Sequence, residues 1–432
     1  MARSERVVRD GMSRRGFLGA AGAVGGSAVA GVAAAGPAAG AAAGGPVRVV
    51  TGTDRLVEED FARLRGRRVG VVTNATGITS DARHLVDVLH AAQGVDLVAV
   101  FGPEHGFRGT AQAGGSEGTA RDPATGLPVY DTHGVSGPAL ARLLTSAGIE
   151  LLVVDVQDVG ARFYTYVWTL YDCLRAAASA GVAVLVPDRP NPIGGLRVSG
   201  PVLDPAYASF VGRVPIALCH GLTIGELALW FRDRWLAAEG VRVSLEVVRM
   251  RGWRRGTRFE GTGLPWVPPS PNVPTPRTAL VYPGTCLFEG TTVSEGRGTT
   301  TPFEVVGAVG IDRRWAEAAQ GLGLPGVWFR EAWFTPTFSK FQGKVCGGVR
   351  VLVHDPERFD PVLAGVGLLV TARRVWSGFA WTPDRFVDRL AGTDALRSLV
   401  DRGADPEEIT GSWRAGLERF AAERAGRLLY PG

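Results

Sequence analysis

The strongest constraint on the fold is a regular alternation of short apolar segments and helical patterns in the first half of the chain. The apolar segments read as buried strands at residues 69–74, 97–101, 151–155 and 182–186. The helical patterns fall between them, at residues 81–92, 138–146 and 167–180. Strands that are apolar throughout and joined by helices predict a parallel sheet covered on both faces. We therefore expect an α/β fold with a Rossmann-like parallel sheet domain.

A proline-rich segment then divides the chain. Residues 264–276 contain six prolines, which predicts a stiff connection without helix or strand. A helix at 223–236, capped by Thr223 and Glu226, and a strand at 243–250 are expected before it. The elements expected after it are a strand at 349–353 and helices at 361–375 and 406–426. This pattern predicts an N-terminal domain over residues 44–268 and a smaller C-terminal α/β domain over residues 269–432.

The first 43 residues have the features of an export signal. Residues 13–18 read SRRGFL and precede a weakly apolar Ala/Gly run with small residues suited to cleavage. The run contains many glycines and lacks Leu and Ile, which disfavours a stable membrane anchor. We therefore expect export through the twin-arginine translocase, in folded form, to the extracellular space or the cell envelope.

Charge and cysteine spacing exclude several classes of function. The formal net charge is +5, of which the first fifteen residues supply +3 (five Arg against one Glu and one Asp), so no basic stripe for nucleic acid is expected. The four cysteines, at 173, 219, 286 and 346, are far apart and lack the spacing of a zinc site. Nucleotide-binding glycine motifs are absent as well. We expect no metal and no cofactor.

Polar loops follow each of the four predicted strands, and the carboxyl ends of parallel strands meet at one edge of a sheet. The loop at residues 101–109 reads FGPEHGFRG and carries Glu104, His105 and Arg108. A glutamate in a turn with glycines and two phenylalanines is expected to be partly buried, and burial raises a carboxyl pKa. Such a group suits proton donation to a leaving oxygen.

Carboxylates beside Arg and Tyr form the inventory that glycoside hydrolysis requires. Residues 155–166 add Asp158, Arg162 and Tyr164 to Glu104. Three arginines, at 162, 189 and 297, have the forked donors that bind a substrate carboxylate, which favours an acidic sugar. The residues are compatible with retention, with inversion and with assistance from the substrate's own acetamido group.

The motifs at residues 101–109, 155–166, 188–192, 270–274 and 289–302 together resemble the NamZ family of exo-β-N-acetylmuramidases, glycoside hydrolase family 171. The resemblance continues through 386–392, 412–413 and 427–430, and departs from the family pattern at 129–134, which concerns fine specificity. It implies a Rossmann-like domain, a smaller second domain and an active site in the cleft between them. It also implies release of N-acetylmuramic acid from the non-reducing ends of peptidoglycan fragments.

The resemblance places the family's catalytic glutamate at Glu104 and its tyrosine at Tyr164, and matches the second-domain motif at 289–297. Our catalytic candidates are therefore Glu104, Tyr164 and His105. The substrate-binding candidates are Asn74, Arg108, Asp158, Arg162, Asp188, Arg189, Asn191, Asn272, Glu289, Glu295 and Arg297. The rival hypothesis is a non-catalytic protein that binds cell-wall sugars on the same scaffold. An amidase or esterase is disfavoured, because the sequence has no recognisable nucleophile–base pair.

Overall fold

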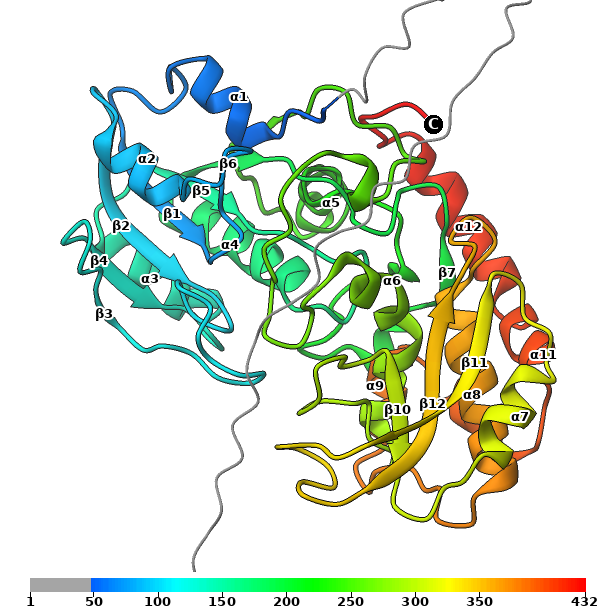
Figure 1. Cartoon of the computed structure of the whole chain (residues 1–432). Coiled ribbons are helices and arrows are strands. Elements are labelled where there is room, and N and C mark those ends of the chain that lie inside the picture. The colour runs from blue at the N-terminus through cyan, green and yellow to red at the C-terminus, as the bar shows by residue number, and fades with distance from the viewer. Residues whose placement is uncertain (1–47) are drawn as a thin grey trace, which may run out of the picture. The chain divides into compact units, whose positions relative to one another are not determined.

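A seven-stranded sheet, parallel except at one edge, organises the first half of the chain (Figure 1). The structure is a computed structural model that describes residues 48–432, so the expected export signal lies outside the described residues. In spatial order the strands are β3 (Ala120–Arg121), β4 (Pro128–Asp131), β2 (Asp96–Gly102), β1 (Arg68–Thr73), β5 (Leu151–Asp155), β6 (Ala183–Pro187) and β9 (Leu245–Val248). Only β3 pairs antiparallel, at the edge with β4. The expected parallel sheet is confirmed.

Helices cover both faces of this sheet. One face packs on α1 (Gly52–Glu58) and α2 (Leu85–Ala91), and the other on α3 (Gly137–Ser146), α4 (Tyr166–Ala180) and α5 (Ile224–Trp230). Helix α2 is shorter than expected because His84 caps its N-terminus. Helix α5 begins with the expected capping box and continues as a π-helical turn, Phe231–Leu236. The apolar strands are thus buried between two helical layers, as their composition requires.

A three-stranded antiparallel sheet forms the second half. Its spatial order is β10 (Val305–Ala308), β12 (Cys346–Val353) and β11 (Val327–Phe334). The helices here are α6 (Pro276–Thr285), α7 (Arg314–Gln320), α8 (Pro361–Val375), α9 (Phe386–Ala391), α10 (Ala395–Asp401), α11 (Pro406–Gly411) and α12 (Arg414–Ala425). The prediction of a single helix at 406–426 is therefore wrong, because the helix is interrupted at Ser412 and Trp413. Short elements complete the chain: β7 (Ser199–Val202), β8 (Ala217–Cys219), and 3-10 turns at Pro205–Tyr207, Phe259–Gly261 and Cys286–Gly290.

The loop after β5 joins the first half to the apolar core of the small sheet. Phe163 and Tyr164, from the loop after β5, belong to the same buried cluster as Phe288 and Trp315 of the second half. The C-terminal segment also returns to the large sheet, where the Tyr430 hydroxyl bonds Asp188. The expected domain boundary at residue 268 stays a prediction.

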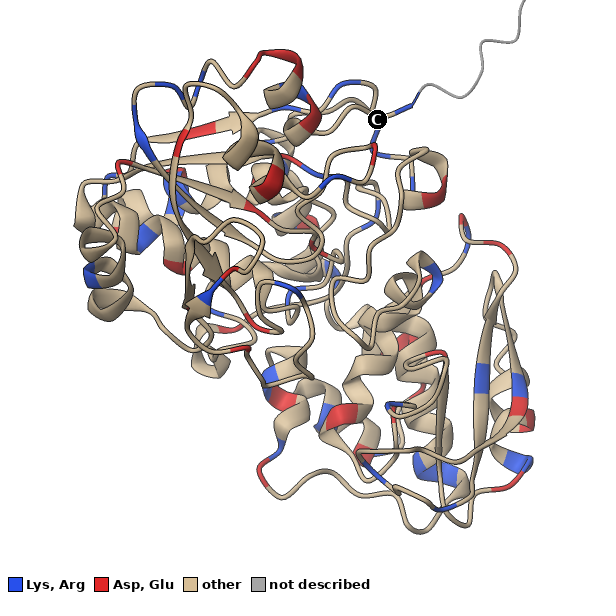
Figure 2. Ribbon diagram, turned by 60° about the vertical axis from the view of Figure 1, so that its left-hand side comes forward, with Lys and Arg blue, Asp and Glu red and all other residues tan. Residues whose placement is uncertain are grey.

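The distribution of charge and the hydropathy of the helices do not indicate a binding partner. Basic and acidic residues are interspersed along both halves of the chain (Figure 2). The four cysteines are buried and carry no disulfide. Across residues 48–432, no helix has both the length and the hydropathy needed to cross a membrane.

Candidate active site

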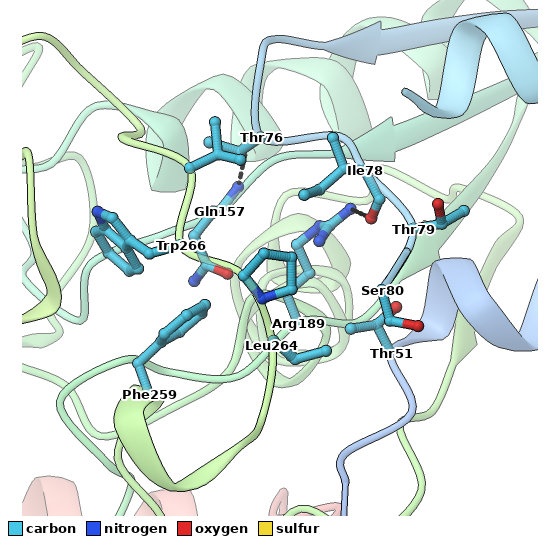
Figure 3. Close-up of a pocket in the computed structure, with 12 residues that line it drawn as sticks. Thr51, Thr76, Ile78, Thr79, Ser80, Gln157, Arg189, Phe259, Leu264 and Trp266 are labelled. Carbon is cyan, nitrogen blue, oxygen red and sulfur yellow. Dashed lines mark hydrogen bonds between the residues drawn. The ribbon is translucent and has the colours of Figure 1, made fainter. Parts of the chain in front are cut away.

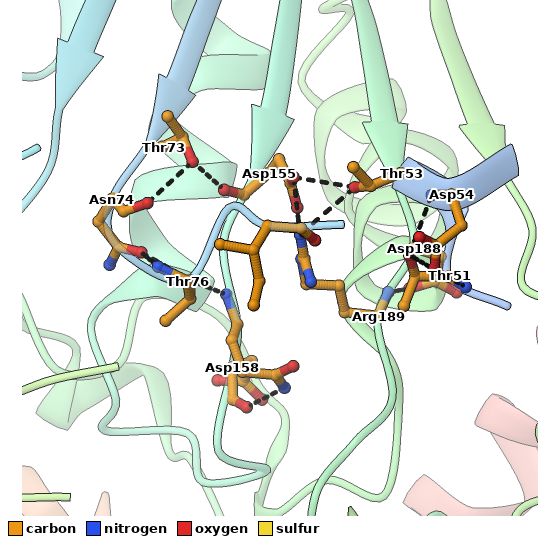
Figure 4. Close-up of polar contacts among 12 residues, drawn as sticks. Thr51, Thr53, Asp54, Thr73, Asn74, Thr76, Asp155, Asp158, Asp188 and Arg189 are labelled. Atoms are coloured by element: carbon orange, nitrogen blue, oxygen red, sulfur yellow. Dashed lines mark hydrogen bonds and ion pairs between the residues drawn. The ribbon is translucent and has the colours of Figure 1, made fainter. Parts of the chain in front are cut away.

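The sheet has a topological switch point between β1 and β5, because the chain moves outward from β1 to β2 and β4 and then returns to β5. Ligands of open α/β sheets commonly bind outside the strands at such a point. Here the chain's own side chains meet each other instead (Figure 4). The Arg189 guanidinium donates to both Asp155 carboxylate oxygens, at 2.5 and 2.8 Å, and Thr53 donates to the same carboxylate at 2.9 Å.

The space that remains at the switch point is too small for a sugar. Phe259, Leu264 and Trp266 close it from the side opposite Thr76 and Ile78 (Figure 3). The enclosed volume is about 20 Å³, close to that of one water molecule. The proline-rich segment has no helix or strand before α6, as expected, and its residues 264–267 line the remaining space at the switch point.

A larger cavity lies farther along the rim, where the loop after β2 and the start of α4 face residues of the second half. We call it the central cavity; its volume is about 300 Å³. Five of the predicted site residues line it: Glu104, His105, Tyr164, Glu289 and Arg297. The structure therefore brings together the catalytic candidates and the second-half motif.

Glu104 is held from both sides. Its Oε1 accepts a hydrogen bond from the Gly114 amide at 2.8 Å, and its Oε2 accepts one from the Thr165 hydroxyl at 2.5 Å. Thr165 is the N-cap residue of α4, yet its side chain makes no capping bond and points to this carboxylate instead. The prediction of a raised pKa for Glu104 is wrong for the unliganded protein. Burial raises the pKa of Glu104, but these hydrogen bonds and the neighbouring His105 and His133 outweigh it and hold the pKa below its ordinary value.

Two residues that line this cavity have a left-handed backbone. His105 has φ of +73° and Phe303 has φ of +63°, a left-handed conformation that bulky residues rarely adopt. The His105 ring donates from Nδ1 to the Ala111 carbonyl at 2.9 Å. Burial lowers the pKa of His105, so its imidazole is neutral near pH 7. The strained turn fixes the direction in which Glu104 points.

The Tyr164 hydroxyl is the outstanding polar group of the central cavity. It is buried and has no hydrogen-bond partner within residues 48–432. Its ring is held edge-on by Tyr166 and Tyr282, with centroids 5.1 and 5.8 Å away. Burial raises the pKa of Tyr164 well above its ordinary value, so the phenol stays protonated. Buried polar groups without a partner are rare in folded proteins, and this one belongs to a side chain that lines the central cavity.

Charged residues of the second half form a compact cluster at the cavity wall. The Arg297 guanidinium donates to Glu289 at 2.6 Å, lies 3.4 Å from Glu295, and stacks 5.0 Å from the Phe303 ring centre. Lys340 lies 3.1 Å from Glu295. Burial and the nearby Glu295 raise the pKa of Glu289, although Arg297 opposes the shift. The cluster places a guanidinium at the cavity wall, and its planar fork suits a carboxylate ligand.

The other candidates make contacts within the protein in the unliganded structure. Arg162 is fully buried and donates to the main-chain carbonyls of Pro201, Ile216 and Leu390. The contacts of the rest are Asn74 to Tyr166, Arg108 to Asp122, Asp158 to His220, Asp188 to Tyr430, Arg189 to Asp155, Asn191 to Leu222, Asn272 to Gln112 and Glu295 to Lys340. Their substrate-binding roles stay predictions.

Two family models cover nearly all of the described chain. The N-terminal model of the exo-β-N-acetylmuramidase NamZ matches residues 69–277, and the C-terminal model matches residues 280–430. The chain belongs to the NamZ family of exo-β-N-acetylmuramidases. It is 42% identical over 385 residues to the peptidoglycan β-N-acetylmuramidase NamZ of Bacillus subtilis strain 168, covering 89% of this chain and 92% of that protein.

Solved structures agree with the fold. Two crystal structures of DUF1343 family proteins from Bacteroides fragilis, at 1.65 and 1.30 Å resolution, superpose with TM-scores of 0.80 and 0.71. They share 33% and 32% identity with this chain, and each match covers 89% of this chain and 99% of the other. The resemblance expected from the motifs is confirmed.

Sequence reasoning missed several residues of the central cavity. Thr165 lies inside a motif that we used, but nothing in its identity indicates a bond to Glu104 sixty-one residues away. Tyr282 and Phe303 lie in apolar surroundings and read as core residues. Phe210 is 60% exposed, and its ring stacks on Phe386 at the edge of the cavity.

Proposed function

We propose that this protein is an exo-acting glycoside hydrolase that releases N-acetylmuramic acid from the non-reducing ends of peptidoglycan fragments. The observation that carries this proposal is the central cavity, which Glu104, Tyr164 and Arg297 line together. Family membership supports the same reaction. A proton donor, a fixed neutral donor and a cationic group are what an acidic sugar requires.

We assign the proton transfer to Glu104. As the bond between the sugar carbon and the glycosidic oxygen breaks, the oxygen takes the Glu104 proton, and the water that adds to the sugar carbon returns one. The carboxyl is ionised in the unliganded protein and gains its proton when a sugar fills the cavity. Burial already acts to raise its pKa, and both the exclusion of water and the anionic lactyl group of the substrate raise it further.

Arg297 is assigned to the lactyl carboxylate of muramic acid. Of the three candidate arginines, it is the one that lines the central cavity, whereas Arg162 and Arg189 do not. Its planar fork suits bidentate binding of a carboxylate. Tyr164 is assigned to a hydrogen bond with the bound sugar.

The direction of attack is tested on glycan strands labelled at the reducing end. We expect free N-acetylmuramic acid as the sole early product from strands that end in muramic acid, while the label stays on strands one residue shorter. Internal fragments of several sugars at early times would contradict exo action.

Thr165→Val tests the assignment of Glu104. The change removes the hydrogen bond at Oε2 and keeps the side-chain shape, so the pKa of Glu104 in the free enzyme rises. An acid catalyst must be protonated, and kcat/KM falls as pH rises through its pKa. The basic limb of the kcat/KM profile is therefore expected to move to higher pH. A limb that stays in place or moves to lower pH would contradict the assignment.

Tyr164→Phe is expected to change stability and activity in opposite directions. The hydroxyl is buried without a partner, so its removal raises the free energy of unfolding by about 1 kcal/mol. Because the same hydroxyl pairs with the substrate, kcat/KM falls at least tenfold. Urea unfolding and steady-state kinetics measure the two effects. A loss of both together would indicate that the hydroxyl supports the fold alone.

We further propose that the protein acts outside the cytoplasm after export by the twin-arginine translocase. The paired Arg14 and Arg15 ahead of an Ala/Gly-rich run support this, as does a substrate that lies in the cell wall. Replacing both by lysine is expected to leave the full-length protein inside the cell. Fractionation with an antibody against the folded protein measures this, and unchanged export would contradict it.

A further inference from the structure

Lys340 brings a positive charge close to the active site, although it is not among the residues that line the central cavity. It belongs to residues 335–345, which join β11 to β12 and which we call the hairpin loop. Its Nζ atom donates to the main-chain carbonyls of Phe288 and Val293, at 2.9 and 3.0 Å, and to the Glu295 carboxylate at 3.1 Å. Any effect of Lys340 on a bound sugar must therefore pass through these partners.

The acceptors around Nζ suit an ammonium group. The carbonyl of Glu289 also lies 3.4 Å from Nζ, so four oxygen atoms converge on one nitrogen. An ammonium offers three donors from a single point, whereas a guanidinium spreads its donors over a plane. Lysine occurs in this chain only at positions 340 and 344, and all other basic residues of its 47 Lys and Arg are arginine. At Lys340 the geometry favours the residue that the chain otherwise avoids.

The backbone on both sides of Lys340 has a left-handed conformation. Ser339 has φ of +69° and Phe341 has φ of +60°, values that residues other than glycine rarely adopt. Such conformations persist only where the surrounding structure holds them. The bonds from the Lys340 ammonium supply such a hold, because they tie the middle of the hairpin loop to residues 288–295.

The hairpin loop also packs against the main chain beside Arg297. The amide and the hydroxyl of Thr337 both donate to the Gly298 carbonyl, each at 2.9 Å. Gly298 has φ of +82°, and a Cβ atom there would lie 2.6 Å from the Phe338 carbonyl oxygen, so the contact requires glycine. The hairpin loop is therefore fixed to both acidic and basic members of the charged cluster.

The Glu295 carboxylate links Lys340 to Arg297. One of its oxygens lies 3.1 Å from Lys340 Nζ, and the other lies 3.4 Å from Arg297 Nε. Lys340 therefore neutralises a carboxylate that would otherwise be balanced by Arg297 alone. Whatever the protonation state of Glu289, Lys340 makes the cluster more positive by one charge. An added positive charge at this distance favours an anion bound at Arg297.

We propose that Lys340 is a positioning residue that sets the preference of the active site for an anionic sugar. It neutralises Glu295 from behind, so that the Arg297 guanidinium is left to attract the lactyl carboxylate of muramic acid. Lys340 itself makes no contact with the sugar. The inference rests on the proposed function, because it takes the lactyl carboxylate as the ligand of Arg297.

Two substrates that differ in charge test this role. One is the nitrophenyl β-glycoside of N-acetylmuramic acid, and the other is the same glycoside with the lactyl carboxylate converted to a primary amide. The measured quantity is the ratio of kcat/KM for the acid to that for the amide. Lys340→Met keeps the length of the side chain and removes its charge, so the ratio is expected to fall roughly tenfold. Glu295→Gln removes the opposing charge, so the ratio is expected to rise.

The double variant Lys340→Met/Glu295→Gln restores the balance of charge and is expected to return the ratio close to the wild-type value, which a disturbed hairpin loop would not do. The matched control is Lys344→Met, an exposed residue of the same loop, and it is expected to leave the ratio unchanged. Thermal unfolding of each variant reports whether it folds. If Lys340→Met does not fold, Glu295→Gln alone decides, and a ratio that stays level or falls in it overturns the inference.

An equal loss on both substrates in Lys340→Met, without recovery in the double variant, would show that Lys340 supports the fold alone and would overturn the inference. In that case the wild-type protein still hydrolyses the acid glycoside, and the proposed function stands. A wild-type protein that hydrolyses neither glycoside would overturn the proposed function, and the role of Lys340 with it.

Discussion

Replacing Glu104 by glutamine is expected to lower kcat on the muramic acid–glucosamine disaccharide by about 10²–10⁴-fold, the range that a positioned proton donor contributes. The amide keeps the shape of the side chain; its oxygen accepts the bond from Gly114 and its NH2 group donates to the Thr165 hydroxyl, but it has no acidic proton to give to the leaving oxygen. Because the binding groups stay in place, KM is expected to change far less than kcat. Steady-state kinetics with release of free muramic acid as the signal measure both.

The matched control is Glu150→Gln. Glu150 is exposed and lies just before β5, at the amino end of that strand. It is expected to retain wild-type kinetics. Thermal unfolding of both variants separates a chemical effect from a loss of fold. A Glu104→Gln protein that turns over at the wild-type rate would remove Glu104 from the mechanism.

Arg297→Gln is expected to have the second-largest effect, on selectivity for muramic acid. A charge-assisted bond of this kind contributes about 1.5–3 kcal/mol, which corresponds to roughly 10–150-fold in kcat/KM. The loss should appear with muramic acid glycosides and not with N-acetylglucosamine glycosides, which lack the lactyl carboxylate. The ratio of kcat/KM for the two substrate classes measures it.

Two further variants distinguish lost binding of the lactyl carboxylate from disturbed packing around Arg297. Arg297→Gln leaves Glu289 without its 2.6 Å partner, so the double variant with Glu289→Gln removes the unpaired charge. Arg297→Lys keeps the charge but not the fork, and is expected to give an intermediate ratio. An equal loss on both substrate classes in all three variants would assign Arg297 to the fold and not to the lactyl group.

The sequence predicts the fold well where one physical signal dominates. Strands β1, β2, β5 and β6 are apolar throughout, and their burial between helical layers leaves few alternatives. The short edge strand β3 has no buried residue and therefore no such signal. Strand β11 is rich in Val, Phe and Trp, but Arg330 and Glu331 interrupt its alternation of apolar and polar residues.

The candidate site is predicted in part, for a different reason. Polar loops at the carboxyl ends of parallel strands converge, and this much follows from the pattern. The pattern does not indicate whether these loops face a ligand or each other. Asp155 and Arg189 neutralise each other in the core, whereas Glu104, two residues beyond the end of β2, reaches open space. That difference depends on the proline-rich segment filling the switch point, which composition alone does not indicate.

The pKa of Glu104 illustrates the same limit. Glycines and phenylalanines beside a glutamate indicate burial, and burial does act to raise the pKa. The opposing hydrogen bonds come from Gly114 and Thr165, which are distant in sequence or unremarkable in type. The direction of the shift is therefore a tertiary property, set by how the loop after β2 meets the start of α4.

The most direct test of hydrolysis is to count the molecules of free N-acetylmuramic acid that the purified wild-type protein releases from the muramic acid–glucosamine disaccharide. The proposed function predicts many molecules per molecule of protein, with an equal amount of free N-acetylglucosamine. Release of one molecule or fewer per protein would contradict it and would identify the chain as a protein that binds cell-wall sugars without cleaving them.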